Sequence, residues 1–405
     1  MNSPVPPRSS ATPPPPPAPI SGGRSKPAST IEQMVRDAHA RQASDIHIRV
    51  NEVPRFRIRG QMLPFKEHPP VTTALFEQFL AEVLTPQQRK RFEDEKELDT
   101  AIFYPGFLRC RVNCFESLNG GAIVLRLISL EVPSIDGLGL PQVMKQLVGH
   151  PQGLVLITGP TGSGKSTSLA AMIRHLNDTM TRHVVTIEDP IEYVHSSNRC
   201  LVSQREVGLH TLEFHQALRA VLREDPDVIL IGEMRDRITV DTALKAAQTG
   251  HLVLATLHTR NAINALNRLL NIYHPEEQHA MRIQITESLL AVLAQQLVST
   301  TDGRRTAVHE VLINTPAMAD YLLKGQETDA FQLMETDTGN GMQIMNQALC
   351  DLVLLGKISP DDAVQASSDP GDLRRRVRNE GYDPSRSTNR EFDPSGGPTR
   401  DYHPV

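Results

Sequence analysis

The nine residues GPTGSGKST, Gly159 to Thr167, constrain the fold of this chain more than any other segment. They match the pattern G-x-x-x-x-G-K-[ST], between an apolar run that predicts a strand and a segment that predicts a helix. In that setting the glycines let backbone N–H groups surround phosphates, and the helix N-terminus adds its positive end. The predicted phosphate-binding residues are Gly159, Pro160, Thr161, Gly162, Ser163, Gly164, Lys165, Ser166 and Thr167.

Two side chains of this loop have specific predicted roles. Lys165 is expected to reach the β- and γ-phosphates of a nucleotide, and Ser166 is expected to ligate Mg²⁺. The sequence therefore predicts ATP and Mg²⁺ as the ligands of the loop.

Four nearly continuous apolar runs, GLVLITG, HVVTIED, DVILIGE and HLVLATLH, occur between residues 153 and 258. Such runs predict strands covered on both faces, and helical segments separate most of them, so we expect an α/β fold with a parallel sheet. Each run ends in glycine, an acid or histidine. Because ligands of open parallel sheets gather at the carboxyl ends of strands, these end residues predict one shared site.

The segment TIEDPIEYVH, residues 186–195, places three acidic side chains at the end of the second run. Beside a phosphate loop, Glu188 and Asp189 are expected to manage Mg²⁺ or water, because a divalent ion that bridges phosphates needs hard oxygen ligands. We take Asp189 as a candidate metal ligand and Glu188 as a candidate catalytic residue. Glu192 fits a solvated turn equally well.

The stretch VILIGEMRD, residues 228–236, ends a strand without the aspartate that such strands usually deliver to a Mg-nucleotide. Gly232 stands there instead and leaves space where the shorter acid would have stood, and the longer Glu233 follows it. A glutamate at this point is suited to orient or deprotonate the attacking water. An ion pair of Glu233 with Arg235 for purely structural purposes is the alternative.

The segment GHLVLATLHT, residues 250–259, has a histidine at each end of its predicted strand. His258 lies at the carboxyl end, where the other strands deliver their acids, and we expect it to sense the γ-phosphate. His251, at the far end, fits a structural role as well as a functional one.

Composition divides the rest of the chain. Pro-rich and Ser-rich stretches cannot bury enough apolar surface to offset the entropy lost on ordering, and Pro and Gly mark an interdomain linker. Helices mixed with antiparallel strands predict a small α+β domain before that linker. The predicted segments are a disordered arm at 1–29, the α+β domain at 30–129, the linker at 130–141, the nucleotide-binding core at 142–275, a mostly helical part at 276–368, and a second disordered tail at 369–405.

The bulk numbers exclude several classes of protein. Among 405 residues the formal net charge is −5 and the pI is about 6.3, which argues against a nucleic-acid partner. No stretch approaches the roughly 18 consecutive apolar residues that span a bilayer, and no signal-peptide pattern occurs, so we expect a cytoplasmic protein. The four cysteines have no zinc spacing and are expected to be buried free thiols.

The motifs GPTGSGKST, TIEDPIEYVH, LREDPDVILIGEMRD and TGHLVLATLHT occur in this order. In that order they resemble the Walker A, Asp box, Walker B and His box of the secretion-superfamily ATPases, and within that superfamily the PilT-type ATPases that retract type IV pili. A glycine followed by a glutamate in the Walker B motif is typical of this superfamily. The resemblance implies a ring-shaped homo-hexamer with a PAS-like N-terminal domain and a RecA-like ATPase core. It also implies an inner-membrane platform protein as partner, a position at the inner face of the cytoplasmic membrane, and a paralogous pilus ATPase as a further partner.

The resemblance also implies a role for two arginines of the first domain. Similar proteins use arginines at the positions of Arg111, in FLRCRVNCF, and Arg126, in VLRLI, to reach the γ-phosphate when the domains close. By sequence pattern alone both would be solvated strand residues.

One segment departs from the main retraction motors, which carry an A-I-R-N-L-I-R-E stretch in the C-terminal part. The matching segment here is AMADYLLKG, residues 317–325, with Ala319 and Leu323 in place of the arginines and Lys324 in place of the acid. This pattern is nearer to the accessory, PilU-like branch of the family. An amphipathic helix that belongs to the core explains the segment equally well.

Three alternatives remain at this point. A pilus-extension or type II secretion ATPase usually adds a large N-terminal domain and a four-cysteine zinc module, and neither is present in this sequence. A RecA-like nucleic-acid translocase is disfavoured by the acidic pI. A catalytically idle scaffold is disfavoured by the complete set of acids and sensors.

Overall fold

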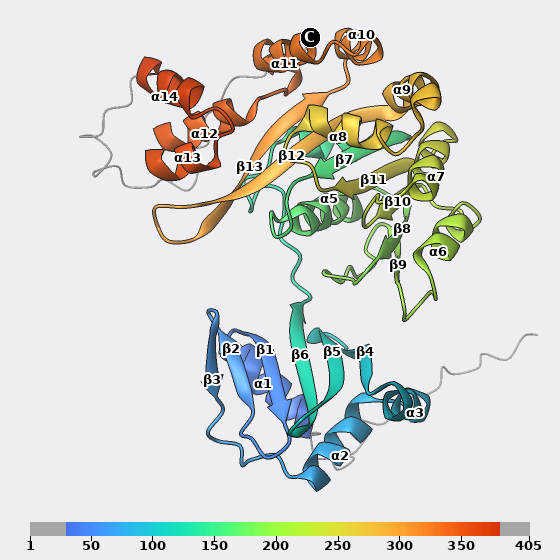
Figure 1. The fold of residues 1–405 in the computed structure, drawn as a ribbon, viewed down its shortest axis with the longest axis vertical. Coiled ribbons are helices and arrows are strands. Elements are labelled where there is room, and N and C mark those ends of the chain that lie inside the picture. The colour runs from blue at the N-terminus through green and yellow to red at the C-terminus, as the bar shows by residue number, and fades with distance from the viewer. Residues whose placement is uncertain (1–29, 381–405) are drawn as a thin grey trace, which may run out of the picture. The chain divides into compact units, whose positions relative to one another are not determined.

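The computed structural model describes residues 30–380 of the chain. These residues divide into two compact units (Figure 1). The N-terminal unit runs to Phe103 and continues over Cys110–Leu127, and the C-terminal unit comprises Tyr104–Arg109 and the residues from Ile128. The predicted arm at 1–29 and residues 381–405 of the predicted tail lie outside the described residues.

The N-terminal unit is a six-stranded sheet in the order β3-β2-β1-β6-β5-β4 with helices α1 to α3. Its buried residues follow the predicted patterns: Met34 and Val35 are buried on the first helix, and Ile46 and Ile48 alternate inward on the first strand. Its elements are α1 (Thr30–Ala40), β1 (Ala43–Arg49), β2 (Arg55–Ile58), β3 (Gln61–Pro64), α2 (Thr73–Val83), α3 (Pro86–Glu95), β4 (Glu97–Tyr104), β5 (Leu108–Ser117) and β6 (Gly120–Ser129).

The C-terminal unit contains the predicted nucleotide-binding core and the helices that follow it. Its elements are α4 (Val143–Leu147), β7 (Gly153–Thr158), α5 (Lys165–Thr179), β8 (His183–Glu188), β9 (Leu201–Glu206), α6 (Phe214–Val221), β10 (Val228–Ile231), α7 (Arg237–Gln248), β11 (Leu252–Leu257), α8 (Ala262–Leu270), α9 (Pro275–Ser288), β12 (Leu289–Ser299), β13 (Arg305–Ile313), α10 (Pro316–Lys324), α11 (Glu327–Thr336), the 3-10 turn η1 (Thr338–Asn340), α12 (Met345–Leu354), α13 (Pro360–Ala366) and α14 (Pro370–Asn379).

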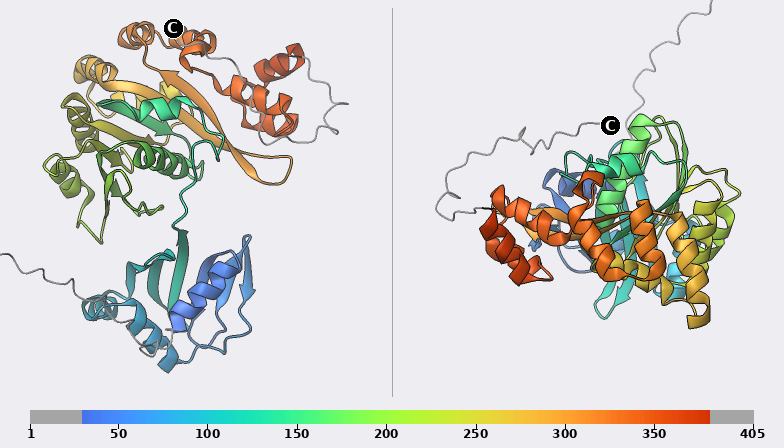
Figure 2. Two further views of the ribbon diagram at one scale, coloured as in Figure 1. Left: turned by 180° about the vertical axis from the view of Figure 1, so that it is seen from behind. Right: turned by 90° about the horizontal axis from the view of Figure 1, so that it is seen from above.

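The sheet of the C-terminal unit has the order β13-β12-β7-β11-β10-β8-β9, and every neighbouring pair is parallel except β12 and β13. Alternate residues of its strands enter two separate cores: Leu154 and Leu156 pack with α6, α7 and α8, while Val155 and Ile157 pack with α4 and α5. Helices therefore cover both faces, as Figure 2 also shows. This burial on both sides explains the unbroken apolar runs of the central strands.

The prediction that residues 276–368 are mostly helical is wrong for β12 and β13. The segment LLAVLAQQLVS forms the long strand β12, which pairs with β7 on the side opposite β11. Strand β13 then pairs with β12 from Ala291↔Ile313 to Ser299↔Arg305. Leucine and alanine are strong helix formers, but intrinsic helix propensity amounts to less than about 1 kcal/mol per residue, and backbone pairing with two neighbouring strands overrides it.

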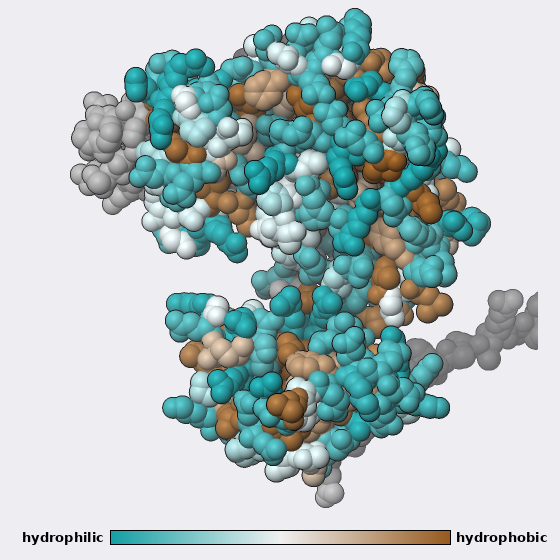
Figure 3. All heavy atoms as spheres, viewed as in Figure 1, coloured by the Kyte–Doolittle hydropathy of each residue, from teal (hydrophilic) through white to brown (hydrophobic). Residues whose placement is uncertain are grey.

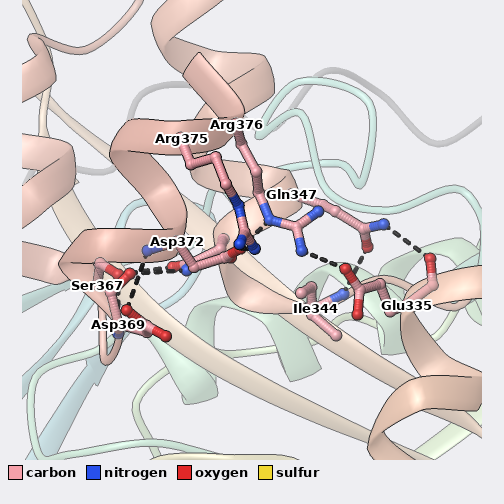
Figure 4. Close-up of polar contacts among 9 residues, drawn as sticks. Glu335, Ile344, Gln347, Ser367, Asp369, Asp372, Arg375 and Arg376 are labelled. Carbon is pink, nitrogen blue, oxygen red and sulfur yellow. Dashed lines mark hydrogen bonds and ion pairs between the residues drawn. The ribbon is translucent and has the colours of Figure 1, made fainter. Parts of the chain in front are cut away.

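The predicted tail also begins too early, because residues 370–379 form helix α14. Asp369 caps its first turn by accepting a hydrogen bond from Asp372 N at 3.0 Å, and Leu373 is buried against the hydrophobic cluster of α12 and α13. Arg376 pairs with Glu335 on α11 and with Asp372, as Figure 4 shows. The segment is polar because ion pairs and one buried leucine, rather than a broad apolar stripe, hold this helix in place.

Large hydrophobic side chains on the surface are scattered rather than gathered. Leu118 and Leu212 are strongly exposed but lie in different units, and the face in Figure 3 has only small brown patches among hydrophilic residues. Within residues 30–380, the structure has no helix both long and apolar enough to cross a membrane.

The packing of α14 leads to a stability prediction. Leu373→Ala removes a side chain that is 1% exposed and should destabilise the fold by about 2 kcal/mol or more, as buried leucine truncations do. Arg374→Ala, on the exposed side of the same helix, should change stability by less than about 0.5 kcal/mol. Urea unfolding of both variants measures the difference, and equal midpoints would show that α14 does not belong to the folded unit.

Candidate functional site

The glycine-rich loop connects the end of β7 to the start of α5. Gly159 follows β7 at φ +152°, and a Cβ at this position would lie only 2.2 Å from the carbonyl oxygen of Gln295 on β12. Gly164 has φ +86° and occupies the position just before α5. The loop therefore needs glycine at Gly159 for close backbone approach and at Gly164 for its left-handed conformation.

Lys165 is folded back onto the loop. Its Nζ donates to the carbonyl oxygens of Gly159 at 2.8 Å and Pro160 at 3.1 Å, and only 8% of the residue is exposed. Burial lowers the pKa of Lys165, while Glu233 and Glu192 act in the opposite direction. The ammonium group thus lies among the backbone groups that are predicted to surround phosphate.

The loop carries one polar atom without a partner. Ser163 is 3% exposed, and its Oγ makes no hydrogen bond to any described residue. Buried hydroxyl groups are normally paired, so this atom indicates that the loop is shaped to receive a further polar group. Together with Lys165, it fits a bound phosphate.

Glu233 and His258 meet at the carboxyl ends of β10 and β11. The Oε1 atom of Glu233 lies 3.1 Å from His258 Nε2, and its Oε2 atom accepts a hydrogen bond from Arg235 at 2.6 Å. Burial acts to raise the pKa of Glu233, but the hydrogen bonds from Arg235 and His258 outweigh it and lower that pKa. The carboxylate is therefore ionised and can accept a proton.

Glycine is needed at position 232 for a structural reason that the sequence did not reveal. Its N–H donates to Ile187 O at 2.9 Å, and a Cβ would lie 3.1 Å from that same oxygen and 3.5 Å from Glu188 Cα. Gly232 thus lets the end of β10 approach the end of β8 closely. We predicted free space at this position, whereas the backbone of β8 is packed against it.

Glu188 lies on the other side of β8, toward β9. Its Oε1 accepts hydrogen bonds from Thr186 Oγ1 at 2.6 Å and Gln204 Nε2 at 3.1 Å, while burial raises its pKa. Gln204 also donates to Tyr193 O and accepts from His195 N, each at 2.8 Å. Gln204 therefore fixes both Glu188 and the loop of acids after β8.

The remaining predicted site residues of this unit are more accessible. Asp189 and Glu192 are exposed, and Ser166 is half-buried at the start of α5. His251 lies at the opposite end of β11 from His258, where its Nδ1 donates to Ala246 O at 3.0 Å. His251 is thus separated from the strand ends that carry Glu233 and His258.

Arg111 and Arg126 belong to the N-terminal unit, on the neighbouring strands β5 and β6. Arg126 is 66% exposed at its side chain and donates to the buried Asp45 at 2.9 Å; Arg111 lies 3.7 Å from Asp99. Both guanidinium groups are held by acids of their own unit.

Sequence reasoning missed the hydrogen bonds that join the strand ends. Thr158 Oγ1, at the end of β7, accepts from Thr259 N at 2.8 Å and donates to Thr259 O at 2.9 Å, next to His258. It also missed Gln295 on β12, whose side chain donates a hydrogen bond to the loop carbonyl of Ser163. The only sequence features that could have pointed to these residues are the threonine that ends the apolar run of β7 and the glutamine within the apolar run of β12.

A family model described as "Type II/IV secretion system protein" matches residues 23–336. The chain belongs to this type II/IV secretion system protein family. Among its relatives, the type IV pilus retraction ATPase PilT of Pseudomonas aeruginosa is 42% identical over 332 residues, which cover 81% of this chain and 95% of PilT. The type IV pilus ATPase PilU of the same bacterium is 41% identical over 348 residues, which cover 86% of this chain and 91% of PilU.

Solved structures of this secretion family confirm the predicted α/β class. The pilus retraction motor PilT with bound ADP superimposes with a TM-score of 0.79 and 39% sequence identity, over 85% of this chain and 98% of that one. The Legionella pneumophila ATPase DotB gives a TM-score of 0.68 and 30% identity over 85% and 96% of the two chains. Type II secretion system protein E of Pseudomonas aeruginosa is 36% identical, and the match covers only 53% of that longer protein.

Proposed function

We propose that this chain is an ATPase whose hexamer drives the retraction of type IV pili. The observation that carries the proposal is the pairing of Glu233, after β10, with His258 at the end of β11, the strand beside β7 and its phosphate loop. The pilus ATPases PilT and PilU, at 42% and 41% identity, support the pilus function. Type II secretion system protein E is 36% identical, and this lower identity favours the retraction class over the secretion class.

Four side chains of the C-terminal unit have proposed roles in hydrolysis. Lys165 exchanges the carbonyls of Gly159 and Pro160 for the β- and γ-phosphate oxygens, which are stronger, charged acceptors. Glu233 accepts a proton from the attacking water, and His258 holds that carboxylate while contacting the γ-phosphate. Ser163 offers its unpaired hydroxyl to the phosphates.

Mg²⁺ accompanies the nucleotide. Mg²⁺ binds through a few hard oxygen ligands of the protein together with phosphates and water, and the Ser166 hydroxyl and the Asp189 carboxylate are oxygen donors of that kind. Ser166 and Asp189 are its proposed ligands, and Glu188 orders water near it. When bound there, the ion would neutralise part of the negative charge of the phosphates.

The N-terminal unit completes the enzyme. We propose that this PAS-like domain brings Arg111 and Arg126 to the γ-phosphate bound by the RecA-like core, so that they leave Asp99 and Asp45 for a more strongly charged partner. The resulting domain movement acts on an inner-membrane platform protein at the cytoplasmic face of the membrane. A paralogous pilus ATPase is a further proposed partner of the ring, and nucleic acid has no part in this function.

Glu233→Gln separates catalysis from binding. It keeps the shape of the side chain and one of its two acceptor oxygens but cannot take up the proton of water, so kcat should fall about 10²–10⁴-fold while ADP binds as in the parent chain. Steady-state ATPase assays and a fluorescent ADP titration give the two quantities. Turnover equal to that of the parent would rule out Glu233 as the base.

The proposed arginines have a matched control in Arg57, which also faces Asp45 but has no predicted catalytic role. Arg111→Ala or Arg126→Ala should lower kcat about 10³-fold or more, as loss of an arginine finger does, while Arg57→Ala should retain most activity. If all three variants hydrolyse ATP equally fast, the arginines have no part in the reaction.

Deleting the gene in its source bacterium tests the pilus function. Without retraction, pili should accumulate on the cell surface and twitching should stop, and electron microscopy with a motility assay measures both. A cell without pili would instead assign the chain to pilus extension.

A further inference from the structure

Gln295 lies directly beneath the phosphate loop. It follows Ala294, which pairs with Thr158 at the end of β7, so β12 runs on under the segment where the loop begins. Gln295 Nε2 donates to Ser163 O at 2.7 Å, and its Oε1 accepts from Ser168 Oγ on α5 at 2.7 Å. The side chain thus contacts both the loop and the helix that follows it.

The partners fix the orientation of this amide. Ser163 O can only accept a hydrogen bond, so the NH₂ group of Gln295 must face it. The Oε1 atom then faces His309 Nε2 at 3.0 Å, which makes that ring nitrogen the donor. Burial lowers the pKa of His309 to about 3, so the ring is neutral with its proton on Nε2.

These groups are sealed from water. Gln295 is 2% exposed, Ser168 is 1% exposed and His309 is 2% exposed. A buried polar group that loses its partner costs about 1–3 kcal/mol, so each hydrogen bond of the group strongly favours the observed arrangement. The amide also fills the space below Gly164, where a Cβ would lie 3.0 Å from Gln295 Nε2.

The direction of the Ser163 carbonyl determines the direction of the next N–H group. The peptide between Ser163 and Gly164 is planar and trans, so its C=O and N–H point in opposite directions. Because Gln295 holds the C=O below the loop, the N–H of Gly164 points to the other side. That side is where the phosphate loop is expected to bind its ligand.

We propose that Gln295 is a positioning residue for nucleotide binding: its amide holds the Ser163–Gly164 peptide with the N–H toward the phosphates. This inference rests on the proposed ATPase function. His309, opposite Gln295 in the β12–β13 ladder, supports the amide from β13. The β12–β13 hairpin is therefore part of the nucleotide site.

The neighbouring residue supplies a matched control. Gln296 lies on the same strand and also donates one side-chain hydrogen bond to a backbone carbonyl, Ala366 O at 2.9 Å, but that partner is on α13. Methionine has nearly the shape of glutamine without its hydrogen bonds. Gln295→Met and Gln296→Met thus each remove a donor to a backbone carbonyl, and only the first of these carbonyls belongs to the loop; Gln295→Met also removes the acceptor for Ser168 and His309.

The test is the dissociation constant of ADP, measured by titration on folded full-length protein, with melting temperatures recorded in parallel. Gln295→Met should weaken ADP binding about tenfold, which corresponds to about 1.4 kcal/mol, whereas Gln296→Met should bind ADP as the parent does. A merely structural role would lower both melting temperatures and leave both dissociation constants unchanged, and that result would overturn the proposal.

A second variant covers the case in which Gln295→Met does not fold. Gln295→Glu keeps the acceptor for Ser168 and His309 but has no donor for Ser163 O while its carboxyl group is ionised, whereas the protonated carboxyl group donates to that oxygen. Compared with the parent at the same pH, it should bind ADP more weakly at high pH and with similar affinity at low pH. Parent-like affinity at high pH would overturn the role of the donor. Failure of the parent chain itself to bind ADP would overturn the proposed function, which distinguishes the two.

Discussion

Parallel pairing of β7 with β11, and of β11 with β10, sets the position of the main residues of the site. The β7–β11 ladder ends at Leu257↔Thr158, so the chain leaves both strands at one level, into Gly159 on one side and His258 on the other. On the far side of β11, Ile231 pairs with Ala255, and Glu233 follows two residues later. The loop, the acid and the histidine meet because their strands end at the same edge of the sheet.

The two charged groups at this edge, Lys165 and Glu233, already have hydrogen-bond partners in the absence of a nucleotide. Lys165 is held by two neutral carbonyls, which are weaker acceptors than phosphate oxygens. Glu233 stays ionised because Arg235 and His258 donate to it despite its partial burial. In the proposed function, the ammonium group of Lys165 binds phosphate and the carboxylate of Glu233 activates water at this edge.

The sequence predicts the residues that belong to local motifs, and it misses those that depend on distant pairing. Glu233 and His258 could be placed because each directly follows an apolar strand, and parallel strands share an edge. Gln295 could not, since LLAVLAQQLVS has the composition of a helix and becomes a strand only through pairing with β7 and β13. We expected Gly232 to leave free space beside Glu233. Its role is instead to let the end of β10 approach the end of β8, and the sequence does not reveal this contact. For α14, one buried leucine and a few ion pairs gave too weak a pattern.

The most direct test of this account is a crystal structure of the Glu233→Gln protein with ATP and Mg²⁺. We expect the γ-phosphate to lie within hydrogen-bonding distance of His258, with a water between the phosphate and residue 233. We also expect Lys165 Nζ to leave the carbonyls of Gly159 and Pro160 for phosphate oxygens. A structure with the nucleotide in the loop, Lys165 unmoved and residue 233 directed away from the phosphates would contradict it.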